Sequence, residues 1–138
     1  MSRSRYDGAL EVFVYSRAAI ERVAPHDVPH VIVSITSSEH DVARLPINPQ
    51  CRGVLRLSFL DVQQDDRDAF TPQHAALVWK LVDAHPDVNR LLAHCDAGIS
   101  RSPAVAIAVL EARGGDTRPL FARYMPNLRV LRMLRETR

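Results

Sequence analysis

The chain has 138 residues, 46% of them hydrophobic and 25% charged, which predicts one compact domain over residues 1–138. Its formal net charge of +2 is too small to indicate nucleic-acid binding, and its two cysteines, Cys51 and Cys95, are too few for a disulfide framework. The N-terminal stretch lacks the apolar region of a signal peptide, and no apolar run is long enough to span a membrane. We therefore expect a cytoplasmic protein that binds no nucleic acid.

Predicted strands and helices alternate along the chain. Short runs rich in β-formers predict strands at residues 10–15, 31–35, 54–59 and 90–93. Cap residues and apolar periodicity predict helices at residues 16–23, 72–85, 103–112, 117–125 and 127–135. Two polar segments, residues 36–50 and 61–70, predict loops. This order predicts an α/β fold: a central, mostly parallel sheet of four to five strands, flanked by helices.

The most informative segment is HCDAGISRS, residues 94–102, which lies between the last predicted strand and the apolar helix at 103–112. In a parallel sheet this position is the carboxyl edge, where loops meet helix N-termini and sites form. We expect Ser102 to cap the helix and Pro103 to be its first residue. Gly98 allows a backbone conformation, or a close approach, that a larger residue would resist.

The residue types in this segment predict an anion site with a nucleophile at its base. Cysteine attacks as the thiolate, which helix N-termini and nearby donors favour. Successive backbone N–H groups and the fork of Arg101 can hold the oxygens of a tetrahedral dianion. We expect Cys95 to attack phosphorus, Ser102 to hydrogen-bond the sulfur and His94 to hold the loop or the thiolate. The residues expected to form the phosphate-binding loop are Asp96, Ala97, Gly98, Ile99, Ser100 and Arg101.

This segment resembles the signature of the cysteine-dependent protein tyrosine phosphatases, in which His-Cys, five residues and Arg are followed by Ser or Thr. Its AGISRS form looks most like the dual-specificity branch. The resemblance implies that Cys95 is the nucleophile, that Arg101 binds phosphate and stabilises the transition state, and that no metal or other cofactor takes part. The Pro126-Asn127 pair before the last predicted helix also resembles a feature near the end of many dual-specificity phosphatases.

The resemblance also implies a general acid, an aspartate on a loop some thirty residues before the cysteine. Several aspartates occupy the predicted loop at 61–70. Asp61 directly follows the strand that ends at Phe59, and this Phe-x-Asp arrangement resembles the start of the acid loop in related small phosphatases. We therefore favour Asp61 and keep Asp66 and Asp65 as alternatives. Asp96 lies inside the phosphate loop, and we expect its side chain to face solvent without a role in acid catalysis.

The sequence thus predicts a phosphatase of the dual-specificity type. Its expected substrates are proteins phosphorylated on tyrosine, or small phosphomonoesters. Three alternatives stay open. The same loop serves inositol-polyphosphate and phosphoinositide phosphatases, and a chain that has lost the chemistry would be a phosphate-binding module. A thiol redox protein is a third, although Cys-x-x-Cys is absent.

Three remaining features have two interpretations each. Cys51 is either a half-buried small residue or a resolving cysteine for oxidised Cys95. The histidines at 30, 40, 74 and 85 show no metal-ligand spacing and are interpreted as structural or solvated. A series of arginines near the end of the chain forms either solvated helix faces or a basic rim for a polyanionic substrate. These are Arg118, Arg123, Arg129, Arg132, Arg135 and Arg138.

Overall fold

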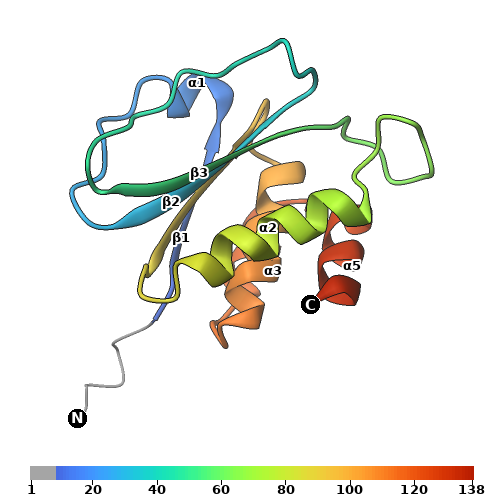
Figure 1. The fold of residues 1–138 in the computed structure, drawn as a ribbon. Coiled ribbons are helices and arrows are strands. Elements are labelled where there is room, and N and C mark those ends of the chain that lie inside the picture. Colours follow the sequence, from blue (N-terminus) through green and yellow to red (C-terminus); the bar gives the residue numbers. More distant parts are fainter. Residues whose placement is uncertain (1–8) are drawn as a thin grey trace.

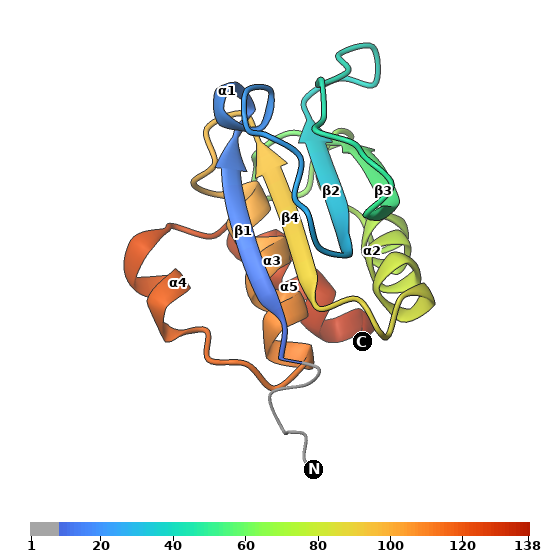
Figure 2. The same cartoon turned by 90° about the vertical axis from the view of Figure 1, so that its left-hand side faces the viewer.

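A computed structural model describes residues 9–138. Four strands form one sheet in the order β1-β4-β2-β3, and all three pairings are parallel. The strands are β1 (Glu11–Ser16), β2 (His30–Thr36), β3 (Cys51–Ser58) and β4 (Arg90–Cys95). This confirms the predicted parallel α/β sheet and sets the number of strands in the described residues at four. Because the strands are parallel, their carboxyl ends meet at one edge of the sheet. Figure 2 shows the arrows of the strands pointing toward this edge.

Five helices connect or follow these strands. They are α1 (Arg17–Ile20), α2 (Pro72–Ala84), α3 (Arg101–Ala112), α4 (Arg118–Arg123) and α5 (Leu128–Thr137). Helices α2, α3 and α5 cover one face of the sheet, and α1 with long connecting segments lies on the other (Figure 1). Helix α4 lies beside the β1 edge (Figure 2). None of the described helices is long and apolar enough to cross a membrane.

Each face of the sheet buries a separate apolar cluster. The larger cluster joins alternate residues of β2 and β4 to α2, α3 and α5, and includes Trp79, Ile107 and Leu134. The smaller cluster consists of Ile20, Ile32 and Leu92. Helix α3 is buried along almost its whole length, as the apolar run at residues 103–110 predicts. The segment at residues 94–102 therefore connects a largely buried strand, β4, to a largely buried helix.

Local capping chemistry explains two helix starts. The Ser16 hydroxyl accepts a hydrogen bond from the Ala19 N–H at 3.1 Å and begins α1. The Thr71 hydroxyl likewise accepts the His74 N–H at the start of α2. The Thr71 N–H in turn donates to the His74 Nδ1, which completes a capping box. Helix α2 ends at Ala84, one residue before the predicted end.

Several predicted boundaries differ from those of the structure. Helix α1 ends at Ile20 rather than at Val23, because Arg22 and Val23 both donate to the Ala19 carbonyl in a turn. Strand β3 begins at Cys51, three residues before its predicted start at residue 54. The extra residues pair with β2, except at one irregularity near His30. Helices α4 and α5 begin at Arg118 and Leu128, one residue after their predicted starts, because Thr117 and Asn127 occupy the cap positions.

Helix α3 begins at Arg101, two residues before the predicted start at Pro103. The first helical bond runs from the Ala104 N–H to the Ser100 carbonyl, so residues 101–103 form the first turn. Pro103 is tolerated there because the N–H groups of a first turn have no helical partner. Ser102 is therefore not the cap, and its N–H is free to point at the cysteine.

The sheet separates the two cysteines. Cys51 begins β3 beside His30 of β2, and Cys95 ends β4. The register places Cys51 near the level of Leu91, so the cysteines lie roughly 13–16 Å apart along the strands and two strand spacings, about 10 Å, across them. A disulfide needs Cα atoms within about 7 Å. The resolving-cysteine interpretation of Cys51 is therefore wrong for this fold, and Cys51 is a half-buried thiol.

Candidate active site

The loop from Asp96 to Ser100 connects the end of β4 to the start of α3. Three of its carbonyl groups accept hydrogen bonds from neighbouring segments. The Asp96 carbonyl accepts from the Arg17 N–H at 3.0 Å, the Ile99 carbonyl from Met125 at 3.1 Å, and the Ser100 carbonyl from Asn127 at 2.9 Å. None of the backbone N–H groups of residues 97–101 donates to another described residue. These donors therefore remain available for an anion, next to the N-terminus of a twelve-residue helix.

Gly98 is required by the shape of this loop. Its φ is +71°, in the left-handed region that residues with a Cβ avoid. A Cβ at this position would lie 2.7 Å from the Ser16 nitrogen and 2.8 Å from the Tyr15 carbonyl carbon. Both properties expected of Gly98, an unusual conformation and a close approach, are present. A side chain here would push the loop away from the end of β1.

Cys95 lies beneath the loop and is buried. Its Sγ is 3.1 Å from the Ser102 Oγ and 3.4 Å from the Ser102 backbone nitrogen, which donates to it. The first turn of α3 thus directs a hydroxyl and an N–H at the same sulfur. Hydrogen-bond donors of this kind stabilise a thiolate. The Ser102 hydroxyl therefore lies where it can donate a hydrogen bond to a Cys95 thiolate.

His94 is fully buried and contacts the next strand rather than the loop opening. Its Nε2 lies 2.6 Å from the Ser34 Oγ of β2, and its Nδ1 lies 3.5 Å from the Cys95 carbonyl. Burial lowers the pKa of His94 below its ordinary value, so the ring stays neutral near pH 7. His94 therefore holds the base of the loop by hydrogen bonds.

Arg101 is buried, with only 6% of its side chain exposed. Its Nη1 donates to the Phe59 carbonyl at 2.8 Å and to the Ser37 Oγ at 3.0 Å. Its Nη2 donates to the Asp96 Oδ2 at 3.1 Å, and its buried Nε has no partner among the described residues. The Nη1 group is thus bound to the surrounding protein. At the other edge of the guanidinium, Nη2 binds a carboxylate and Nε has no described partner.

Asp96 behaves differently from the sequence-based expectation. Its side chain is 49% exposed, as predicted, but it does not simply face solvent. The carboxylate forms the ion pair with Arg101 and also accepts a hydrogen bond from the Ser37 hydroxyl at 3.2 Å. The expectation overlooked this pairing because it depends on the curvature of the loop, which brings residues five positions apart together.

Among the three acid candidates, Asp61 contacts the phosphate loop. Its Oδ1 accepts the Ser100 hydroxyl at 2.8 Å and the Asn127 Nδ2 at 2.8 Å. Asn127 is buried and also donates to the Val62 carbonyl, while its own Oδ1 caps α5 by accepting the Val130 N–H. The loop at residues 61–70, called the acid loop from here on, therefore meets the loop at residues 94–102 and α5 at the Asp61 carboxylate.

The two alternative candidates are held elsewhere. Asp65 forms an ion pair with Arg129 at 2.7 Å, and this hydrogen bond lowers the pKa of the Asp65 carboxyl below its ordinary value. Asp66 accepts the Asp68 N–H at 2.9 Å and so closes a turn within its own loop. Neither carboxylate has a described contact with residues 94–102.

Two site residues escaped the sequence analysis. Ser37 follows β2 and binds both Arg101 and Asp96, and the Phe59 carbonyl at the end of β3 binds Arg101. Both lie just past the carboxyl end of a parallel strand, and that position was the available signal. Asn127 was noticed only as part of a family resemblance, and its contact with Asp61 was not predicted.

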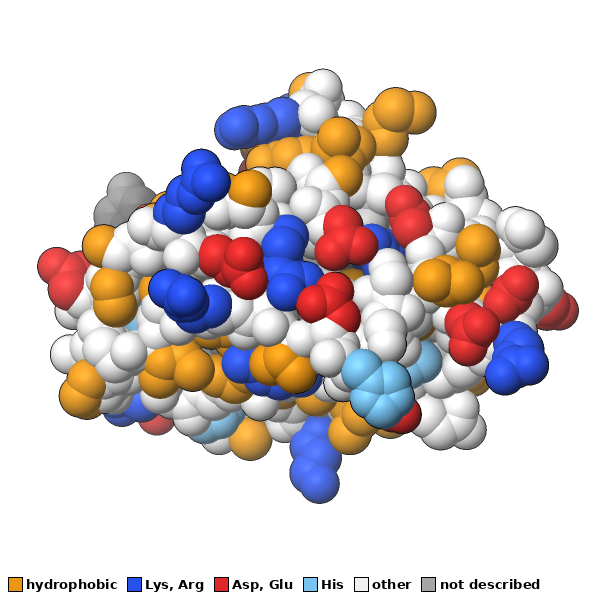
Figure 3. Space-filling model, turned by 90° about the horizontal axis from the view of Figure 1, so that it is seen from above, with side chains coloured by type: hydrophobic (Ala, Val, Ile, Leu, Met, Phe, Trp, Pro, Cys, Tyr) orange, Lys and Arg blue, Asp and Glu red, His pale blue; other side chains and the backbone are white. Residues whose placement is uncertain are grey.

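A polar hollow of about 560 Å³ lies beside Arg101 at this edge of the sheet. Its lining includes Ser37 and Phe59, which contact Arg101, together with His40 and charged side chains of both signs: Glu39, Arg67 and Asp68. Figure 3 looks onto this end of the molecule and shows acidic side chains interspersed with basic ones. The surroundings of the loop are thus of mixed charge.

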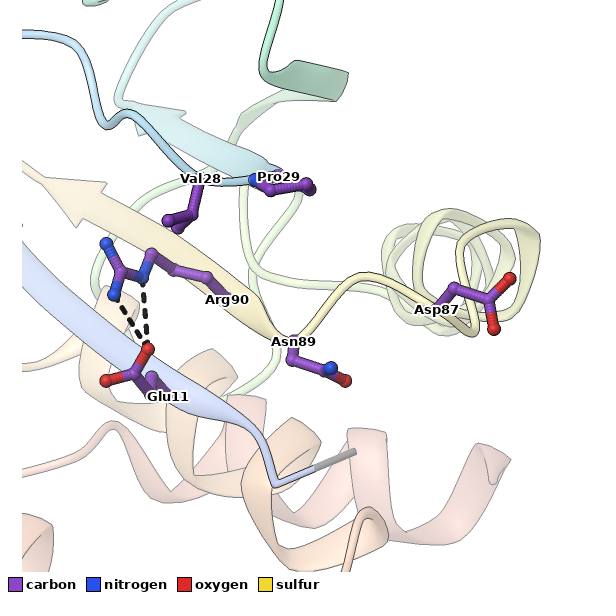
Figure 4. Close-up of a pocket in the computed structure, with 6 residues that line it drawn as sticks. All are labelled: Glu11, Val28, Pro29, Asp87, Asn89 and Arg90. Carbon is purple, nitrogen blue, oxygen red and sulfur yellow. Dashed lines mark hydrogen bonds and ion pairs between the residues drawn. The ribbon is translucent and has the colours of Figure 1, made fainter. Parts of the chain in front are cut away.

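A second hollow, of about 260 Å³, lies at the opposite edge of the sheet (Figure 4). Its lining residues are Glu11, Val28, Pro29, Asp87, Asn89 and Arg90. Arg90 points toward Glu11 and pairs with it at 2.7 Å, so the principal charges of this hollow neutralise each other. Cys95, the N–H groups of residues 97–101 and Asp61 all lie at the other edge.

The C-terminal arginines do not form a basic rim. Five of the six pair with carboxylates: Arg118 with Asp116, Arg129 with Asp65, Arg132 with Glu136, Arg135 with Glu111 and Arg138 with Asp83. Arg123 lies against the Tyr124 ring. The alternative of a rim for polyanions therefore lacks its free charges. Within residues 9–138 no cluster of His, Cys, Asp or Glu has the arrangement of a metal site.

No family model and no curated protein matches the sequence. Solved structures do match, and the fold they share with this chain is that of the cysteine-dependent tyrosine and dual-specificity phosphatases. The human tyrosine phosphatase-like serine/threonine/tyrosine-interacting protein is 22% identical, with a TM-score of 0.58 over 91% of this chain and 89% of that one. Human DUSP28 is 20% identical, with a TM-score of 0.52 over 91% and 90%. The Cydia pomonella PTP-2 phosphatase is 18% identical, with a TM-score of 0.55 over 91% and 84%.

Proposed function

We propose that this protein hydrolyses phosphate monoesters through a cysteinyl-phosphate intermediate, with phosphotyrosine in proteins as the favoured substrate. The observation that carries the proposal is the phosphate loop itself. Three of its carbonyls are bonded to neighbouring segments, and the N–H groups of residues 97–101 have no partner among the described residues. The buried Cys95 sulfur contacts the Ser102 hydroxyl and accepts the Ser102 N–H. Such preoriented donors stabilise the charge on transferring phosphoryl oxygens without reorganising during the reaction.

In the first step, the Cys95 thiolate attacks phosphorus in line, the S–P bond forms and the bond to the leaving oxygen breaks. The N–H groups of residues 97–101 and the Arg101 guanidinium hold the equatorial oxygens. In the second step, water attacks phosphorus, the S–P bond breaks and inorganic phosphate leaves. The Ser102 hydroxyl, 3.1 Å from the sulfur, stabilises the departing thiolate. No metal is needed for either step.

Asp61 serves as the general acid and then as the general base. Its Oδ1 is fixed by two donors, Ser100 and Asn127, so the proton for the leaving oxygen is carried on Oδ2. The same carboxylate then takes a proton from the attacking water. Asp65 is a poorer donor, because Arg129 lowers its pKa and so keeps it ionised.

The surroundings of the loop favour a singly phosphorylated substrate over an inositol polyphosphate or a phosphoinositide. A polyanion is recognised by unpaired basic side chains. Here the cation next to the loop on α1, Arg17, pairs with both Asp41 and Glu21. In the hollow beside Arg101, Arg67 lies 4.0 Å from Asp68. A phosphotyrosine side chain, with one phosphate and a flat apolar ring, presents less charge to these carboxylates.

The test is steady-state hydrolysis of an aryl phosphate and of phosphotyrosine, phosphoserine and inositol-hexakisphosphate substrates by the wild type and Cys95→Ser. We expect the wild type to prefer phosphotyrosine and the variant to lose turnover while it still binds inorganic phosphate. Turnover by Cys95→Ser at the wild-type rate would refute the mechanism. A wild type that binds phosphopeptides without hydrolysing them would be a phosphate-binding module instead.

A further inference from the structure

The phosphate loop contains an acidic residue that binds its own arginine. Asp96, the first residue after the nucleophile, pairs with Arg101 at 3.1 Å and accepts a second bond from Ser37. An ion pair at this position is unexpected in an anion site, because the arginine expected to bind phosphate is already bound to a carboxylate. The pair is partly desolvated on one side only, since Arg101 is 6% exposed and Asp96 is 49% exposed.

The two ends of the Arg101 guanidinium have different environments. Nη1 is committed to the Phe59 carbonyl and the Ser37 hydroxyl, both parts of the protein frame. Nη2 holds Asp96, and Nε is buried without a partner. A buried, unpaired N–H carries a desolvation penalty that a ligand oxygen would remove. Nε and Nη2 together form one edge of the fork, which matches two oxygens of a phosphate.

We infer that Asp96 is a specificity-determining residue, whose carboxylate occupies Arg101 Nη2 in the free protein and gives up that donor when a phosphate binds. This inference rests on the proposed function. The incoming phosphate takes Nε, which has no partner, and Nη2, which Asp96 releases. Asp96 is half exposed, so its carboxylate can turn to solvent or stay on the Ser37 hydroxyl without moving the backbone.

The charge of Asp96 then sets which anions the loop accepts. A phosphate dianion binds close to a carboxylate, and their repulsion weakens binding relative to the loop alone. The penalty grows with the charge of the ligand, so further phosphates on a substrate increase it. Asp96 therefore selects singly phosphorylated substrates and promotes release of the phosphate product.

The experiment measures binding of inorganic phosphate by calorimetry to the wild type, Asp96→Asn and Glu39→Gln. Asparagine keeps the shape and the hydrogen-bond acceptor of Asp96 but removes the charge. Glu39 lines the hollow beside Arg101, but its side chain is 82% exposed and has no described contact with Arg101. We expect Asp96→Asn to bind phosphate about tenfold more tightly and Glu39→Gln to change binding less than twofold.

A pair of ligands matched in shape but not in charge separates this role from a structural one. Sulfate and perchlorate are both tetrahedral, but sulfate carries two charges and perchlorate one. At constant ionic strength, Asp96→Asn should improve sulfate binding several times more than perchlorate binding. A loop that was merely reshaped would change both alike. Asp96→Ala, which removes the acceptor as well, should give the same order of ligands and covers the case in which asparagine disturbs folding.

The outcomes distinguish this inference from the proposed function. Equal phosphate binding by the wild type and Asp96→Asn, or an equal effect of Glu39→Gln, overturns the role of Asp96 and leaves the phosphatase proposal standing. Absence of phosphate binding in all three proteins overturns the phosphate loop itself. Tighter binding in Asp96→Asn together with no turnover in the wild type supports the role of Asp96 and refutes the enzyme.

Discussion

Two buried arginines, Arg101 and Arg129, lie in different regions of the molecule and are used in different ways. Both pair with an aspartate of a loop: Arg101 with Asp96 in the phosphate loop, and Arg129 with Asp65 in the acid loop. The Nε of Arg129 donates to the Phe70 carbonyl at 2.9 Å. The Nε of Arg101 has no described partner.

This difference distinguishes an arginine whose inner donor is satisfied by the protein from one that we propose binds the substrate phosphate. Arg129 joins α5 to the buried end of the acid loop, and its inner donor is satisfied by the protein. Arg101 is anchored at one end and incomplete at the other. A buried donor without a partner costs free energy, and it persists where function requires the donor. The comparison predicts that substitutions in the two regions affect different measurements.

The largest effect should come from Arg101→Lys. Lysine keeps the charge but cannot bind two oxygens with one planar fork, so kcat/KM for an aryl phosphate should fall about 10³-fold. The matched control is Arg129→Lys, which should lower kcat/KM less than fivefold. Steady-state kinetics on both variants checks this. If the two variants lose activity equally, the distinction between the arginines is wrong.

The next effect concerns the aspartates of the acid loop. Asp61→Asn should reduce turnover about 10²-fold for an alkyl phosphate, whose leaving oxygen needs a proton, and much less for an aryl phosphate with a good leaving group. Asp65→Asn should leave both rates near the wild type, because Asp65 contacts Arg129 rather than the phosphate loop. A loss of alkyl-phosphate turnover in Asp65→Asn or Asp66→Asn, but not in Asp61→Asn, would reassign the acid.

A smaller effect, on stability, should come from Arg129→Lys. The substitution leaves the Phe70 carbonyl without its donor in a buried position, and this should lower the free energy of unfolding by about 1–3 kcal/mol. The Asp65 contact adds little, because that side chain is 100% exposed and the pair is screened by solvent. Urea denaturation measures the difference. If Asp65→Asn lowers the free energy of unfolding as much as Arg129→Lys does, the effect does not come from the contact of Arg129 with the Phe70 carbonyl.

The smallest effect concerns the histidine beneath the phosphate loop. Burial lowers the pKa of His94, so below about pH 6.5 the unfolded chain binds a proton that the folded protein does not. The free energy of unfolding should therefore fall as the pH decreases from 7.5 to 5.5, by at most about 1.4 kcal/mol per pH unit for this group. His94→Gln should reduce that slope, and His26 and His74, whose pKa values burial also lowers, should maintain part of it. The exposed His40 provides a control substitution, and an unchanged slope in His94→Gln would exclude His94 as a source.

Much of the fold follows from local features of the sequence. Runs of β-formers mark all four described strands, and the side chains of Ser16, Thr71 and Asn127 cap three helices as short polar residues do before an apolar run. The proposed reaction chemistry also rests on local sequence, because Cys95, Gly98, Arg101 and Ser102 lie within one short segment. Local order is predictable where neighbours in the chain make the deciding contacts.

Local sequence patterns were therefore enough to predict the alternation of strands and helices, the parallel sheet, and the position of residues 94–102 between the last strand and a buried helix. They did not predict that Asp61 meets Ser100 and Asn127, that Asp65 pairs with Arg129, or that Cys51 lies at the opposite end of the strands from Cys95. Only the tertiary structure decided these contacts, and also that Asp96 holds Arg101 and that the C-terminal arginines are mostly paired. These outcomes depend on contacts between residues far apart in the chain, or on the curvature of a loop, and neither is encoded in local spacing.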